Sequence, residues 1–244
     1  MMRDGAIIFD MDGLMVDSEA LAMESWQEAA RREAVAIPDA LCIDMIGLNQ
    51  VDSERLLANR LGEGFPLERV CARYLEELEA RLHGGKIEAK AGLYALLDYL
   101  ESKGVAKAVA TSANREEAAL KLEAVGVLHR FRVIVTSEQV SRGKPAPDLF
   151  VLAAARLGVA PERCTVLEDS EAGVQAAHAA GMRPIMVPDI KQPTPATLRL
   201  AARVCASLEE VREFLAKEDS ANGCRGGAVG DGAKRNGDGI RRAG

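Results

Sequence analysis

Short apolar runs alternate with helical segments along most of this chain, and no other feature restricts its fold as strongly. Glycine closes several of the helical segments between the runs, as at Gly104, Gly158 and Gly181. The predicted strands are Ala6–Phe9, Val105–Ala110, Phe131–Val135, Thr165–Leu167 and Pro184–Val187, with a last strand and helix within Arg203–Lys217. This rhythm is typical of a parallel sheet with helices on both faces. We therefore predict an α/β fold of that kind.

Residues 17–91 have a different pattern, because helical periodicity continues there without the alternation of a strand. The predicted helices are Ser18–Ala34, Asp39–Met45, Val51–Leu61 and Pro66–Leu82. We predict an all-helical domain at 17–91, inserted after the first strand of a core formed by residues 1–16 and 92–217. An insertion at that point suits a lid over the strand ends. The alternative is a helical decoration with no part in the site.

The end of the sequence, residues 218–244, is rich in Gly, Asn, Asp and Arg and nearly free of large apolar side chains. Such a segment buries too little apolar surface to offset the entropy of ordering it. We expect it to be disordered. Its basic end, AKRNGDGIRRAG, is interpreted as a solvated tail rather than a site for an anionic partner.

Composition limits the partners and the compartment. Of the 244 residues 48% are hydrophobic, the formal net charge is −6, and no block of Lys and Arg gathers in the body of the chain, which argues against nucleic acid. No apolar run approaches the roughly 18 residues of a membrane span, and the N-terminus lacks the apolar stretch of a signal peptide. The five cysteines form no Cys-x-x-Cys pair. We expect a cytoplasmic monomer that binds neither nucleic acid nor a membrane.

Polar side chains stand at the ends of three predicted strands. They are Asp10 and Asp12, Thr111 and Ser112, and Glu168 and Asp169. Ligands of such folds bind outside the carboxyl ends of the strands, so these residues mark the candidate site. A buried charge needs a partner or a cation, which favours a metal or reaction site. Carboxylates at the end of a strand are also ordinary turn residues, and the sequence of the first strand alone does not separate the two.

Asp10 and Asp12 face the same site, because residues two apart on an extended chain point the same way. Asp10 can be a nucleophile, whereas Asp12 would have to carry a proton to act as an acid. Four carboxylates and a phosphate dianion at one edge carry more charge than Lys144 alone offsets. One Mg²⁺ supplies the missing positive charge and prefers oxygen ligands. Thr111 and the amides after it, near the start of a helix capped by Asn114, are placed to hold phosphate oxygens.

Four motifs in this order carry a family resemblance. They are FDMDGLMVDSE, VATSANRE, SRGKPAPDLF and VLEDSEAGVQAA, within residues 7–187. The chain resembles the haloacid dehalogenase superfamily, and more narrowly the branch that holds β-phosphoglucomutase and small sugar-phosphate phosphatases. The resemblance implies a Rossmann-like core with a mobile helical cap. It also implies a Mg²⁺-dependent phosphatase that hydrolyses a small phosphomonoester, such as a sugar phosphate, through an aspartyl-phosphate.

The resemblance also implies roles for individual residues. Asp10 would be the nucleophile, and Asp12 would protonate the leaving group and then activate water. The phosphoryl group would be held by Thr111, Lys144 and the backbone at Ser112 and Ala113. The metal ligands would be Asp10, the backbone carbonyl of Asp12, Glu168 and Asp169. From their positions alone, the further candidate substrate contacts are Gly47, Gln50 and Asn114.

Three alternatives to a phosphatase are weighed on single positions. Asp12 argues against a dehalogenase, which needs no acid two residues after its nucleophile. A phosphosugar mutase resembling β-phosphoglucomutase would carry His where this chain has Ala22 and Arg where it has Gln50. These two departures favour hydrolysis, although Arg55 could replace the missing Arg. A non-catalytic phospho-ligand-binding protein would lack a reactive residue, and none of the five implied here is missing.

Overall fold

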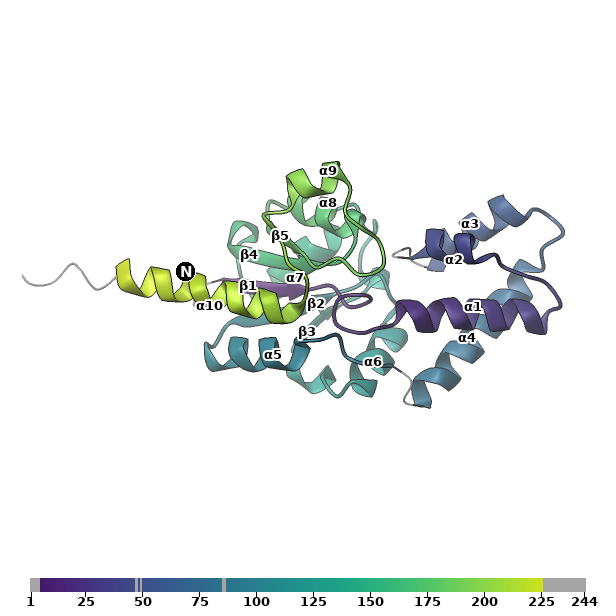
Figure 1. The fold of residues 1–244 in the computed structure, drawn as a ribbon, viewed down its shortest axis with the longest axis horizontal. Coiled ribbons are helices and arrows are strands. Elements are labelled where there is room, and N and C mark those ends of the chain that lie inside the picture. Colours follow the sequence, from purple (N-terminus) through teal and green to yellow (C-terminus); the bar gives the residue numbers. More distant parts are fainter. Residues whose placement is uncertain (1–4, 47, 49, 85–86, 226–244) are drawn as a thin grey trace, which may run out of the picture.

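A computed structural model describes residues 5–46, 48, 50–84 and 87–225 of the chain (Figure 1). Its centre is one six-stranded sheet in the order β3-β2-β1-β4-β5-β6, in which every pair of neighbours is parallel. The strands are β1 Ala6–Phe9, β2 Ala106–Ala110, β3 Val133–Val135, β4 Cys164–Glu168, β5 Arg183–Met186 and β6 Arg203–Val204. The predicted α/β fold with a Rossmann-like parallel sheet is confirmed.

Helices cover both faces of the sheet. Alternate residues of β1 point to opposite sides, and since all four are apolar, each face needs a cover of other apolar residues. Ile7 and Phe9 belong to a core shared with α5 Leu93–Ser102, α6 Arg115–Ala124 and α10 Leu208–Arg225. Ala6 and Ile8 belong to the opposite core, which is shared with α7 Asp148–Leu157 and α8 Glu171–Ala179. The short α9, Pro195–Leu200, packs on α8. The described connections include 3₁₀ turns at Leu128–Arg130, Ser137–Gln139 and Pro161–Arg163.

The described residues between β1 and α5 form four helices beyond the carboxyl ends of the strands, at the right of Figure 1. They are α1 Glu19–Arg32, α2 Asp39–Met45, α3 Gln50–Leu61 and α4 Leu67–His83. The rings of Trp26 on α1 and Tyr74 on α4 stack with centroids 3.9 Å apart. The two chain segments that lead into and out of these helices run together. Asp17 N–H donates to Glu88 O at 2.9 Å, and Lys90 N–H donates to Met15 O at 2.9 Å.

The predicted disorder from residue 218 is wrong for its first residues, because α10 continues to Arg225. Arg183 on β5 donates two hydrogen bonds of 2.8 Å to Glu218, and Lys103 lies 2.8 Å from Asp219. These ion pairs tie the later part of α10 to β5 and to the end of α5. The rest of the predicted tail, 226–244, lies outside the described residues. Within the described part of the chain, no helix has the length and apolarity to cross a membrane.

Candidate active site

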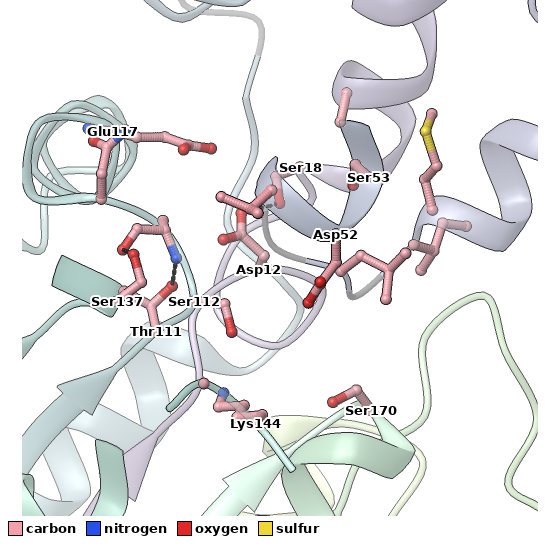
Figure 2. Close-up of a pocket in the computed structure, with 18 of the residues that line it drawn as sticks. Asp12, Ser18, Asp52, Ser53, Thr111, Ser112, Glu117, Ser137, Lys144 and Ser170 are labelled. Atoms are coloured by element: carbon pink, nitrogen blue, oxygen red, sulfur yellow. Dashed lines mark hydrogen bonds between the residues drawn. The ribbon is translucent and has the colours of Figure 1, made fainter. Parts of the chain in front are cut away.

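A cavity of about 590 Å³ lies between the carboxyl ends of the strands and the helices α1–α4 (Figure 2). Nearly all of the residues predicted at the strand ends line it, namely Asp10, Asp12, Thr111, Ser112, Ala113, Asn114, Lys144 and Asp169. The sheet register explains this convergence. Asp10 N–H donates to Leu167 O and Thr111 N–H donates to Val135 O, so neighbouring strands end at the same level.

Three buried carboxylates meet at the end of this cavity that lies over the strands. Asp10 follows β1, Glu168 ends β4 and Asp169 comes next, and each offers an oxygen within 4.8 Å of the other two. Lys144 donates to Glu168 Oε1 at 2.6 Å and also to Asp10 Oδ1. Gly173 leaves room for Glu168, because a Cβ there would lie 1.7 Å from its Oε1. The sequence therefore predicted the members of this triad, Asp10, Glu168 and Asp169, and the lysine beside them.

Burial dominates the electrostatics of the triad. It raises the pKa of Asp10 to about 8, with Lys144 acting in the opposite direction and Glu168 adding to the rise. Burial and the neighbouring carboxylates also raise the pKa of Asp169 well above its ordinary value. Lys144 keeps its proton, because the two acids it contacts outweigh the effect of its burial and raise its pKa. Carboxylates that are costly to keep ionised when buried gain from a bound cation, and a group of ligands that are all oxygen atoms fits a hard divalent cation such as Mg²⁺.

The Asp12 side chain points away from the triad to a second group of residues. Its Oδ1 accepts hydrogen bonds from Ser18 Oγ at 2.5 Å and Lys121 Nζ at 2.6 Å. Lys121 also lies 2.6 Å from Glu117 Oε1, and its side chain is only 5% exposed. Burial alone would lower the pKa of Lys121, but Asp12 and Glu117 more than offset it and the pKa is raised.

Lys121 was missed at the sequence level. It stands four residues after Glu117 on a helix, which is the spacing of an exposed ion pair. Nothing in that spacing indicates that the lysine reaches Asp12. Ser18 was predicted as a helix cap and does precede α1, but its hydroxyl binds Asp12 and caps no backbone N–H.

Thr111, Ser112, Ala113 and Asn114 form the turn from β2 into α6. Thr111 is almost fully buried, with 1% of the residue exposed, and its Oγ1 accepts a hydrogen bond from Ala113 N–H at 3.0 Å. Asn114 caps α6 as predicted, accepting from Glu117 N–H at 2.9 Å. The turn therefore places a hydroxyl and the N-terminus of a ten-residue helix at the cavity, a combination that favours anions. Both Thr111 and Lys144 line the cavity, and Figure 2 shows them beside the strand ends.

The helices α1–α4 supply the rest of the wall. Glu19, Ala22, Met23 and Trp26 of α1 line the cavity, together with Tyr74 of α4. Burial, and then the negative charge of Asp12, raises the pKa of Glu19 to about 7. Two predicted substrate contacts fall at the edge of the described part of the chain. Gly47 lies outside the described residues, and Gln50 begins α3 with a side chain outside the described part.

Comparison with known proteins gives consistent results. The family model for haloacid dehalogenase-like hydrolases matches residues 7–187. Phosphorylated carbohydrates phosphatase of Thermotoga maritima is 33% identical over 180 residues, 74% of this chain and 83% of that protein. Hexitol phosphatase A of Escherichia coli is 36% identical over 188 residues, 76% of this chain and 84% of that protein. The crystal structure of β-phosphoglucomutase from Clostridium difficile has the same fold, with a TM-score of 0.74 at 21% identity over 92% of this chain and 100% of that one.

The matched residues begin in β1 and end just after β5, so they include the whole acid triad and Lys144. The match to the family model and the similarity to named phosphatases place the protein among the phosphoric monoester hydrolases. The chain belongs to the haloacid dehalogenase-like hydrolase family, in its branch of sugar-phosphate phosphatases.

Proposed function

We propose that the protein is a Mg²⁺-dependent phosphatase that hydrolyses a sugar or polyol phosphate through a phosphoryl group on Asp10. The observation that carries this proposal is the buried triad of Asp10, Glu168 and Asp169, with Lys144 between two of its members, at one end of a cavity. The names of the relatives that act on phosphorylated carbohydrates and hexitols support the substrate class.

In the first step the Asp10 carboxylate attacks the phosphorus and forms a P–O bond to it. The bond from phosphorus to the ester oxygen breaks, and that oxygen leaves with a proton from Asp12. Thr111 and the amides after it hold the phosphoryl oxygens, while Lys144 pairs with both Asp10 and the phosphoryl group. Fixed donors of this kind stabilise the charge that spreads over these oxygens in the transition state.

In the second step a water molecule attacks the phosphorus of the Asp10 phosphate. Asp12, now a carboxylate, takes the proton of that water. The bond between Asp10 and phosphorus breaks, which releases inorganic phosphate and restores the Asp10 carboxylate. The proton on Asp12 is then ready for the next leaving group.

The metal would be held by Asp10, Glu168, Asp169 and the backbone carbonyl of Asp12. When bound, it offsets negative charge on the triad and on the phosphoryl group. The helices α1–α4 would act as the cap that closes over the substrate and excludes bulk water. Ala22 supports hydrolysis over a mutase reaction, since it lines the cavity where the mutase resemblance places a histidine.

A phosphate-release assay tests this function. Sugar and polyol phosphates are incubated with the protein and Mg²⁺, beside an EDTA control and an Asp10→Asn control, with β-glucose 1-phosphate in the panel and glucose 6-phosphate monitored. We expect release that both controls abolish. Conversion to glucose 6-phosphate with little release would support a mutase instead, and no turnover of any ester would support a binding protein.

A further inference from the structure

The wall that faces the leaving group has an unusual charge balance. The residues of α1–α4 and their connections that line it, among those described, include two acids, Glu19 and Asp52, and no basic side chain. The remainder are apolar residues, Trp26, and the hydroxyl groups of Ser18, Ser53 and Tyr74.

Only two lysines line the cavity within the described ranges, and both have two acidic partners already. Lys144 contacts Asp10 and Glu168 with 6% of its side chain exposed. Lys121 contacts Asp12 and Glu117 with 5% exposed. Neither is placed to bind a second anionic group on the leaving-group side, because moving it would leave buried carboxylates uncompensated.

Two further cations lie close to this wall, and each has a hydrogen-bond partner. Arg55 on α3 lies 2.6 Å from Asp52 Oδ1, and 66% of its side chain faces solvent. Lys191, in the loop after β5, donates to Ile46 O at the end of α2 at 3.0 Å. Neither side chain is part of the cavity lining. The predicted replacement of the mutase arginine by Arg55 therefore has no support in this arrangement.

We infer that this cavity selects phosphate esters whose leaving group carries no negative charge, and accepts an amine on that group at least as well as a hydroxyl. The inference rests on the proposed function and specifies its substrate class. A carboxylate or second phosphate on the leaving group would meet the acids Glu19 and Asp52 in this wall, and no basic side chain of α1–α4 lines the described part of the cavity to bind it. Arg55 pairs with Asp52, and the charge of Lys191 partly offsets that of Glu19, but neither cation lines the cavity. Like charges several ångströms apart in a partly buried site disfavour binding by roughly tenfold or more.

Glu19 gives the positive side of this selection. Its residue is 7% exposed, it lines the cavity, and no hydrogen bond to its carboxyl group occurs among the described residues. A carboxyl group that faces the cavity without a protein donor among the described residues favours a ligand that donates to it. Both a hydroxyl and an ammonium group donate, and an ammonium adds charge attraction. The aromatic faces of Trp26 and Tyr74 in the same wall suit either a sugar ring or a cation.

Two matched pairs of substrates test the inference through kcat/KM at pH 8, above the Glu19 pKa of about 7, with saturating Mg²⁺. Sorbitol 6-phosphate and 6-phosphogluconate are open chains that differ by a carboxylate. Glucose 6-phosphate and glucosamine 6-phosphate differ by an amine. We expect at least roughly tenfold lower kcat/KM for 6-phosphogluconate than for sorbitol 6-phosphate, and glucosamine 6-phosphate at or above glucose 6-phosphate. Equal or better hydrolysis of 6-phosphogluconate would overturn the inference and leave the phosphatase in place.

Variants locate the selection. Glu19→Gln is expected to reduce the discrimination against 6-phosphogluconate several-fold, whereas Glu24→Gln, on the exposed side of the same helix, should leave it unchanged. An equal effect of both variants would contradict the role of Glu19. If no ester is hydrolysed, the proposed function fails. Calorimetric binding of the same four esters to Asp10→Asn then decides the charge preference without turnover, with tighter binding of 6-phosphogluconate than of sorbitol 6-phosphate overturning it.

Discussion

Lys121 Nζ lies 2.6 Å from Asp12 Oδ1, and this contact joins the middle of α6 to the segment that follows β1. Ser18 Oγ binds the same carboxylate oxygen. No hydrogen bond to Asp12 Oδ2 occurs among the described residues, so this oxygen is left for proton transfer. Lys121 thereby fixes the orientation of the acid that the proposed mechanism requires, and it is a positioning residue rather than a catalytic one.

Replacing this lysine should slow catalysis more than binding. We predict that Lys121→Met lowers kcat by about 10- to 100-fold with a smaller change in KM, because Asp12 loses its fixed rotamer. Glu117→Gln is the matched control, since it keeps the contact between Lys121 and Asp12. Steady-state kinetics on both variants checks the prediction. A kcat for Lys121→Met equal to that of the parent would refute the positioning role.

Glu19 should make stability depend on pH. Its pKa rises from 4.5 in the unfolded chain to about 7 in the folded one, so the folded protein binds this proton more tightly. That contribution is present below pH 4.5 and is lost as the pH rises toward 7. At pH 8 relative to pH 4, Glu19→Gln should therefore gain up to about 3 kcal/mol in free energy of unfolding over the parent. Urea unfolding in EDTA measures this, and a gain in the opposite pH direction would contradict the assignment.

Metal binding should stabilise the folded protein through the triad. Mg²⁺ at about 100 times its dissociation constant is expected to add about 2.7 kcal/mol, because it binds only the assembled site. Asp169→Asn should lose most of this gain, whereas Asp44→Asn, which changes an exposed acid on α2, should keep it. Thermal melts with Mg²⁺ and with EDTA provide the readout. Equal stabilisation of the two variants would place the metal elsewhere.

The only tryptophan offers a reporter in the cavity wall. Trp26 is 4% exposed and stacks on Tyr74 with an angle of 8° between the rings. We predict that Tyr74→Ala shifts its emission to longer wavelength and costs about 3 kcal/mol of stability, since a large buried ring is lost. Tyr94→Ala removes an exposed tyrosine on α5, outside the helices α1–α4, and should leave the emission unchanged. An unchanged spectrum in Tyr74→Ala would show that the stack does not form in solution.

The parts of the fold that the sequence predicted are those with local causes. The apolar runs gave the strands within one or two residues, and Asn114 and Gly158 marked a helix start and a helix end. The triad followed from the rule that parallel strands end at the same edge, which brings Asp10 and Asp169 together without any knowledge of side-chain packing.

The parts that were missed depend on packing between distant segments. Phe131 was assigned to a strand, but it follows a 3₁₀ turn and β3 begins at Val133. The helix beyond Lys217 is held by Arg183, far away in the sequence. Lys121 and Ser18 reach Asp12 only once α6 and α1 lie beside β1. In each case the partner is set by the tertiary fold, and local propensity carries no signal for it.

The central claim is that Asp10 carries the phosphoryl group during turnover. The most direct measurement is to stop the reaction with acid during turnover of a hydrolysed ester and to identify phosphorylated peptides by mass spectrometry. The account predicts one phosphoryl group on the peptide that contains Asp10, present with Mg²⁺ and absent in EDTA and in Asp10→Asn. Continued hydrolysis by Asp10→Asn, or a phosphoryl group on another residue, would contradict it.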